Sequence, residues 1–343
     1  MSTRNRLEER YRRVLRLLPA AYRRVWEEDM VAVFLATMRT DDPEDAEYQA
    51  DYGRPPWPEV ASVAWLAVRL RIGTAGAPAP RSVAWGAALR LAALCVLFSH
   101  AALALDQAGF QAWLSGRLPL LPAPPAEWTQ GLATGPWTVA LNAAGILWLP
   151  AFATLVAGHW RAARVLAAVA LVVPAASAVA STGIAIAGGP QPFLAMLWAG
   201  VVLDVLLVVA LAAFEADPAP RRRSWLLALP VAAAAAGAGM FAAPVADAAV
   251  LFDWPGLSCA AVVAGAAVHA LRGPGRDPDW THALAVLAGT ALALRLVTLV
   301  DYATRPGWAT RDAVLLGLAE SAAVLAVLLP LRRSTRRRLH ALS

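Results

Sequence analysis

Long apolar runs dominate the chain after about residue 80, whereas the first 75 residues mix apolar and charged positions. Each run has about the 20 residues that a helix needs to cross a bilayer. A lone strand cannot cross, because its backbone groups would have no partners in lipid. The pattern therefore predicts eight membrane-spanning helices, at residues 82–105, 136–157, 163–187, 193–213, 224–244, 256–271, 281–302 and 312–331.

In the first 75 residues, apolar positions recur at helical spacing, with arginine and glutamate on the opposite face. This predicts two amphipathic helices separated by Pro19 and a third helix from about Pro58 to Ile72. The expected fold class is all-α: a polytopic α-helical membrane bundle preceded by a small cytoplasmic three-helix domain. Its parts are a helical domain at 1–75, a linker at 76–81, the transmembrane bundle at 82–331 and a basic cytoplasmic tail at 332–343.

The placement of arginine predicts that both ends of the chain lie in the cytoplasm. With the N-terminus inside, the outer loops contain three arginines, Arg117, Arg305 and Arg311, while the inner loops and the tail contain many more. Cytoplasmic loops are enriched in basic residues. No short apolar core with a cleavage site follows the charged start, so the first span is expected to be an uncleaved insertion signal. The expected location is the cell (plasma) membrane.

Composition removes several functional classes. The chain is 59% hydrophobic and 16% charged, which argues against a wholly soluble enzyme, a disordered chain and a disulfide scaffold. Much of the net charge of +6 comes from the arginine-rich tail, so no direct binding of nucleic acid is expected. No zinc-protease, serine-nucleophile or nucleotide-binding motif is present. We therefore expect a non-enzymatic protein with no catalytic residue, metal or cofactor.

Four charged residues stand out well inside the predicted spans: Arg90, Asp204, Arg295 and Glu320. Such residues are costly in lipid and are usually paired or functional. Counting residues from the span ends places Arg295 level with Glu320, and Arg90 level with Asp204. The two pairs are expected to stabilise helix packing; an acid beside an arginine that relays protons or binds an anionic solute is the alternative.

His100 and Asn142 share a level near the outer side of their predicted spans. We expect a hydrogen bond between the two helices, with a ligand-binding role as the alternative.

A stripe of large apolar side chains follows the first two predicted helices. It either fills the core of the small domain or forms a face that docks a soluble partner. The candidate partner-docking face consists of Tyr11, Leu15, Tyr22, Trp26, Met30 and Phe34.

Two sequence strings carry a resemblance to known proteins. Arg10–Pro19 (RYRRVLRLLP) followed by Tyr22–Met30 (YRRVWEEDM) resembles the permease-prefix helical domain of bacterial multi-pass proteins, including orphan ABC-type permease subunits. It is also similar to the helical signalling domains of membrane proteins encoded beside PadR-type repressors. Glu59–Val63 and Leu66–Gly73 resemble the segment before the first span in actinobacterial integral membrane proteins of unknown function. The resemblance is confined to about residues 4–73.

Together these features predict a multi-pass membrane protein in contact with the lipid bilayer. The first functional hypothesis is a signalling or assembly component whose N-terminal helices dock a cytoplasmic partner; the resemblance implies a PadR-like regulator or an ABC-type ATPase subunit. The alternative is a permease-like transport subunit for a small or lipophilic solute, energised by a separate chain or an ion gradient.

Overall fold

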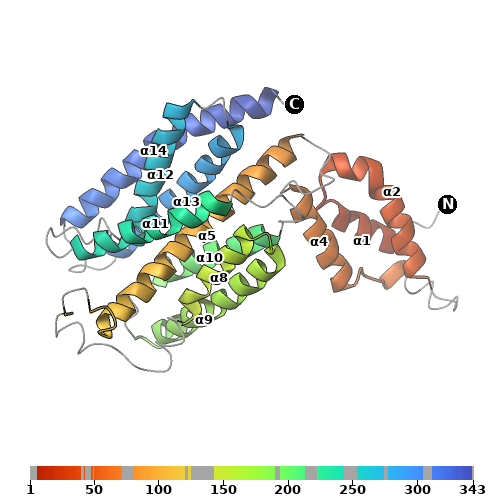
Figure 1. Cartoon of the computed structure of the whole chain (residues 1–343). Helices are drawn as coiled ribbons and strands as arrows, with labels where there is room; N and C mark the ends of the chain where they lie inside the picture. Colours follow the sequence, from red (N-terminus) through yellow and green to blue (C-terminus); the bar gives the residue numbers. More distant parts are fainter. Residues whose placement is uncertain are drawn as a thin grey trace. The chain divides into compact units, whose positions relative to one another are not determined.

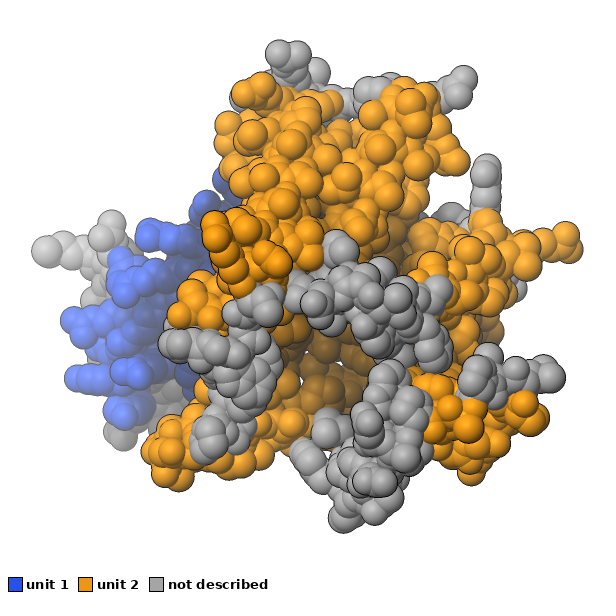
Figure 2. Space-filling view, turned by 90° about the vertical axis from the view of Figure 1, so that its left-hand side faces the viewer, with its two compact units in different colours: residues 1–87, 339–343 blue, residues 88–338 orange. Residues whose placement is uncertain are grey.

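Every regular element in the described part of this computed structural model is an α-helix. The chain divides into two compact units, residues 1–87 with 339–343 and residues 88–338, which Figure 2 shows in different colours. The structure describes residues 6–39, 42, 48, 50–71, 80–119, 123–124, 143–189, 194–212, 222–242, 253–273, 277–303 and 311–341.

Three helices of the first unit share an apolar core (Figure 1): α1 (Arg6–Leu15), α2 (Ala20–Thr37) and α4 (Trp57–Arg71). Pro19 precedes α2 with a φ of −56°, close to the angle that its ring imposes. In the core, the Tyr11 ring stacks on Phe34, with ring centroids 3.9 Å apart and planes inclined by 9°. Leu15 lies beside them and is completely buried.

Most residues of the expected docking face are buried or partly buried in the core of these three helices. Of its six residues, three are at most 5% exposed: Tyr11, Leu15 and Phe34. Tyr22 and Met30 are partly buried against the same core, and Trp26 is 48% exposed. Leu15 therefore has no surface to offer a partner and Tyr11 and Phe34 have little, and the docking face itself stays a prediction. The physical reason for this burial is that short helices are marginal alone and must bury their apolar faces against one another.

The long apolar helices follow in the rest of the chain. Within the second unit α9 packs against α8 and α10, α12 packs against α13, and α10 also contacts α13 (Figure 1). The helices are α5 (Pro80–Leu114), α8 (Trp148–Val156), α9 (Trp160–Ile186), α10 (Leu194–Ala212), α11 (Arg222–Ala242), α12 (Trp254–Arg272), α13 (Pro278–Ala303) and α14 (Arg311–Ala341).

Helix α9 has small residues on its buried side and large apolar residues on its exposed side. Ala163, Ala167 and Ala170 are completely buried, whereas Val165 and Val172 are 61% and 62% exposed. In water the larger side chains would favour the interior. In lipid they can face outward freely, and small residues allow helices to pack closely. This distribution indicates that α9 presents its valines to lipid.

Within the described residues, six helices are long and apolar enough to cross a membrane, which makes the chain a multi-pass membrane protein. They are Ala84–Leu114, Trp160–Ile186, Leu194–Leu211, Trp254–Arg272, Asp279–Ala303 and Arg311–Arg336. The second and fifth expected spans coincide in part with two shorter apolar helical segments, Ala143–Val156 and Arg223–Gly237. Residues 136–142 of the second lie outside the described residues. Eight spans and cytoplasmic termini therefore stay predictions.

Asp301 of α13 holds the start of α10. Its Oδ2 accepts a hydrogen bond from the backbone N–H of Met196 at 3.2 Å, and its side chain is buried. A carboxylate at a helix N-terminus satisfies an amide that has no partner within the helix and interacts favourably with the positive end of the helix dipole. This contact ties α10 to α13, the helix that carries Arg295.

Tyr11 makes the stability of the first unit sensitive to alkaline pH. Its hydroxyl donates a hydrogen bond to Glu59 Oε1 at 2.7 Å. Burial, followed by the hydrogen bond to the Glu59 carboxylate, raises the pKa of Tyr11 above its ordinary value. Because the folded pKa is the higher one, the stabilisation is fully present below a pH of about 10, the ordinary pKa of tyrosine. It is lost as the pH rises from there towards the folded pKa.

We expect Tyr11→Phe to keep the ring stack on Phe34 but to lower the free energy of unfolding of this unit by about 1 kcal/mol at neutral pH. The variant should also lose less stability than the wild type at alkaline pH, because the titrating hydroxyl is gone. Hydrogen exchange of the α1 and α4 amides in the full-length, detergent-solubilised protein measures both effects. An equal alkaline loss in the two proteins would contradict this role of Tyr11.

Candidate functional site

The first polar cluster consists of Asp253, Arg295 and Glu320. Asp253 lies directly before the first residue of α12. Asp253 precedes the helix in an extended conformation, and its Oδ1 accepts a hydrogen bond from the Gly256 backbone N–H at 2.7 Å. Aspartate is a favoured residue at this position, because it satisfies one of the amides that the first turn leaves without a partner. Pro255 lies in the first turn, where a missing N–H costs nothing. The local sequence thus fixes both the helix start and the direction of the carboxylate.

Arg295 of α13 joins Asp253 to α14. Its side chain has 0% of its surface exposed. Nη1 donates a hydrogen bond to Asp253 Oδ2 at 2.7 Å, and Nη2 lies 2.6 Å from Glu320 Oε2. This second contact is an ion pair between the guanidinium and the Glu320 carboxylate. One guanidinium therefore lies between two carboxyl groups from different elements.

Gly317 makes room for this guanidinium. It lies one turn before Glu320 on α14, and a Cβ added to it would be 3.1 Å from Arg295 Nε and 2.8 Å from Leu299 Cδ2. Real Cβ atoms essentially never approach a neighbouring atom as closely as the second distance. A side chain at residue 317 would therefore press on both Leu299 and Arg295, which would have to shift to make room for it.

Tyr302 and Cys259 border the cluster. The Tyr302 hydroxyl lies 3.4 Å from Asp253 Oδ2 and donates a long hydrogen bond to it. Cys259, one turn into α12, is a free and buried cysteine whose Sγ lies 3.9 Å from the Ala291 carbonyl oxygen. The cluster is therefore an acidic site with one arginine, one phenol and one thiol around two carboxyl groups.

A second polar pair joins α5 to α10. His100 Nε2 lies 3.0 Å from Asp204 Oδ1, and both side chains are at most 15% exposed. The imidazole stacks on Trp148, with ring centroids 4.5 Å apart, and lies 6.2 Å from the Trp254 ring. Trp254 directly follows Asp253, so the two polar clusters meet at the first residues of α12.

The sequence predicts Arg90 as the partner of Asp204 and Asn142 as the partner of His100. The structure brings Asp204 and His100 to each other; Asn142 lies outside the described residues, and the pairing of Arg90 with Asp204 stays a prediction. Depth counting missed the contact between His100 and Asp204 because the first long helix continues to Leu114 and not to residue 105. The centre of Ala84–Leu114 is residue 99 and that of Leu194–Ala212 is residue 203, so His100 and Asp204 both lie at mid-helix.

The structure does bring Arg295 and Glu320 together, at the 2.6 Å given above. Sequence reasoning missed Asp253, because it was assigned to an outer loop. A signal was available in the string Asp253-Trp-Pro-Gly256, since aspartate followed by proline in the first turn is typical of a helix start. Gly317 could not be found from the sequence, because its role depends on which helix lies opposite.

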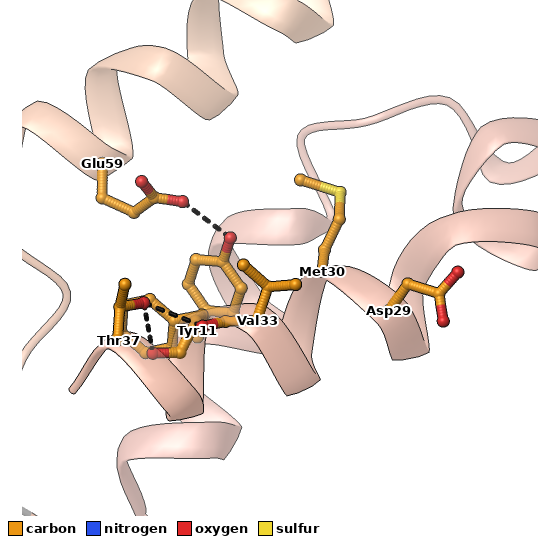
Figure 3. Close-up of a pocket in the computed structure, with 7 residues that line it drawn as sticks. Tyr11, Asp29, Met30, Val33, Thr37 and Glu59 are labelled. Atoms are coloured by element: carbon orange, nitrogen blue, oxygen red, sulfur yellow. Dashed lines mark hydrogen bonds between the residues drawn. The ribbon is translucent and has the colours of Figure 1, made fainter. Parts of the chain in front are cut away.

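The first unit carries a groove of about 380 Å³ (Figure 3), lined by Tyr11, Asp29, Met30, Val33, Phe34, Thr37 and Glu59. Glu59 reaches in from α4 towards the Tyr11 hydroxyl, while Met30 and Val33 enter from α2. The groove therefore has apolar and aromatic walls, with one carboxylate from each of two helices beside them.

No protein-family model, no curated protein and no solved structure matches the chain. The resemblance of the N-terminal strings to permease-prefix and PadR-associated helical domains therefore stays a prediction.

Gly317→Ala tests the packing of the charged cluster. The added methyl group must displace Leu299 and Arg295, and we expect the free energy of unfolding to fall by about 1–3 kcal/mol. Gly289→Ala on α13 is the matched control, because no atom lies within 4 Å of its added Cβ. This control should be neutral or stabilising by up to about 1 kcal/mol, since alanine favours helix.

The measurement is the midpoint of thermal unfolding of the two variants in detergent. Equal midpoints for Gly317→Ala and Gly289→Ala would show that the guanidinium does not depend on the missing side chain.

Proposed function

We propose that this multi-pass membrane protein is non-enzymatic and that its N-terminal helices dock a partner in the cytoplasm of the cell whose plasma membrane it spans. The observation that carries the proposal is the groove between α1, α2 and α4. The expected partner segment is a basic amphipathic helix, and the protein acts as a signalling or assembly component.

Apolar side chains that are not fully buried in the core of the first unit support this docking proposal. Val33 lines the groove and is 66% exposed. Met30, beside it, is only partly buried against the core. An amphipathic helix places its apolar face into such a groove through residues spaced by three and four positions. Val33 and Met30 are themselves one turn apart on α2 and give that helix a surface to contact.

Charge supports a basic partner. Asp29 and Glu59 both line the groove. Arg12, by contrast, pairs with three glutamates: its Nε donates to Glu8 at 2.9 Å, its terminal nitrogens donate to both Glu28 oxygens at 2.7 and 2.9 Å, and Glu27 lies 3.7 Å away. These hydrogen bonds to Arg12 lower the pKa of Glu28. The acidic groups at the groove would favour lysine or arginine at the edge of the docked helix.

A second function, transport of a small or lipophilic solute, is favoured by a different observation. The Asp253–Arg295–Glu320 cluster buries charge beside apolar, membrane-length helices, and such groups often mark a solute or ion pathway. Flux of a solute into vesicles that falls on joint neutralisation of Arg295 and Glu320 would support this function, and unchanged flux with normal expression would reject it.

Docking is tested with a photo-crosslinking amino acid placed at residue 33 of the full-length protein in its own cells. We expect one protein to be captured at residue 33, and the capture to fall several-fold when Asp29→Arg is added, because the partner helix is basic. Residue 25 is the matched control: Val25 is on the same helix and is also 66% exposed, but does not line the groove.

Equal capture at residues 25 and 33 would contradict the proposal. So would capture at residue 33 that Asp29→Arg leaves unchanged, because a partner without basic residues would not respond to the reversed charge.

A further inference from the structure

Helix α4 has an outward face without charge. Its core side carries Val63, Ala67 and Leu70, which are at most 4% exposed. On the opposite side, the exposed residues in the first part of the helix are Trp57, Pro58, Ala61, Ser62 and Trp65. None of these five residues is charged, although they face away from the core. They are called the α4 outer face below.

The other two helices of the first unit expose charged residues. In α1 the exposed residues are Arg6, Glu9 and Arg13, as expected for a helix whose outer side meets water. The exposed residues of α2 include Arg24 and Glu28. The lack of charge on the α4 outer face is therefore a property of this helix and not of the whole unit.

Two tryptophans dominate the α4 outer face. Trp57 is 84% exposed and Trp65 is 38% exposed. They lie about two turns apart on the same side of the helix, with about 12 Å between them along the axis. A helix that lies flat on a surface can therefore place both rings at one depth. Indole prefers the boundary between hydrocarbon and water, where the ring contacts lipid and the N–H reaches water.

Basic residues flank this face. From Arg54 to Arg71 the sequence contains three arginines and a single acid, Glu59. Glu59 accepts the hydrogen bond from the Tyr11 hydroxyl, so its carboxylate is directed towards the core side. Arg54 and Arg71 are both exposed, one before the helix and one at its last residue. Positive charge at both ends of an apolar helix face is complementary to a surface of anionic headgroups.

The bilayer cannot be far from α4. The helix ends at Arg71, and the first membrane-length helical segment begins at Ala84. An extended chain covers at most about 3.5 Å per residue, so this short connection holds α4 near the membrane that the chain spans. A tethered surface meets its partner at a high effective concentration, so even a weak attraction to lipid is sufficient.

We propose that the α4 outer face lies on the surface of the bilayer, with Trp57 and Trp65 at the level of the headgroups and the flanking arginines beside anionic phospholipid. The partner of this face is thus a negatively charged lipid surface. The proposal goes beyond the docking function proposed above and does not rest on it, because neither tryptophan lines the groove.

The experiment measures the depth of a nitroxide spin label on the full-length protein in vesicles of phosphatidylcholine and phosphatidylglycerol. The label is attached at Ala61→Cys, in a chain that also carries Cys95→Ala and Cys259→Ala. Ala36→Cys is the matched control, because Ala36 is an exposed alanine on α2. We expect the ratio of collisions with oxygen to collisions with a water-soluble nickel complex to be several-fold higher at residue 61 than at residue 36.

Lipid composition and charge reversal of the surface test the anionic partner. In vesicles of phosphatidylcholine alone, the label at residue 61 should become more accessible to the nickel complex, because the arginines have no anionic headgroups beside them. Arg54→Gln combined with Arg71→Gln should give the same change in the mixed vesicles.

A second measurement needs no cysteine and remains valid where a cysteine variant does not fold. The difference in fluorescence between the wild type and the variant with Trp57→Phe and Trp65→Phe is the emission of these two tryptophans. This emission should fall in vesicles of brominated phospholipid and should resist iodide in the water. Phenylalanine at two exposed positions leaves the core intact, so the variant should unfold at the same temperature as the wild type.

Several results would overturn the proposal. If the nickel complex reaches residue 61 as readily as residue 36, the α4 outer face lies in water. A label at residue 61 that is shielded from both oxygen and nickel would show that protein covers the face, whether a partner, a second copy or the rest of this chain. An equal depth with and without phosphatidylglycerol, or tryptophan emission that iodide quenches and brominated lipid does not, would also contradict it.

Discussion

Polar groups inside a membrane bundle must find their partners within the protein, and this constraint governs the second unit. In lipid no water is present to satisfy a buried donor or charge. Arg295 has the largest completely buried side chain among the described residues, and it is tolerated because Asp253 and Glu320 reach it from two other elements. Asp301 follows the same rule by accepting a backbone N–H of α10. Each of these contacts also fixes how two helices lie against each other.

The start of α12 is where these constraints meet. Asp253 begins the helix through its Oδ1 and holds Arg295 through its Oδ2, while the next residue, Trp254, faces His100. A movement of this helix end would therefore alter both polar clusters together. Such coupling through a shared rigid element is the physical basis on which two sites can affect each other.

Periodicity and composition were enough to predict an all-helical, multi-pass protein, because a 20-residue apolar run has few other solutions. They also placed Arg295 level with Glu320, since α13 and α14 follow one another in the chain. The same depth counting did not find His100 beside Asp204. Counting residues from a span end gives the correct depth only when that end is known. The last part of α5, up to Leu114, contains polar residues such as Asp106 and Gln107, so the apolar pattern stops before the helix does. The role of Gly317 depends on a neighbour that no local pattern specifies.

Exposure has a different meaning in the two units, and this decides where a partner should be sought. Val172 on α9 is 62% exposed and Val33 on α2 is 66% exposed. On α9 the exposed valines face away from buried alanines, as lipid allows. On α2 the neighbouring residues include Glu27, Glu28 and Asp29, which require water. Of these two exposed valines, the one at the groove of the first unit is therefore the one that the proposed docking would cover.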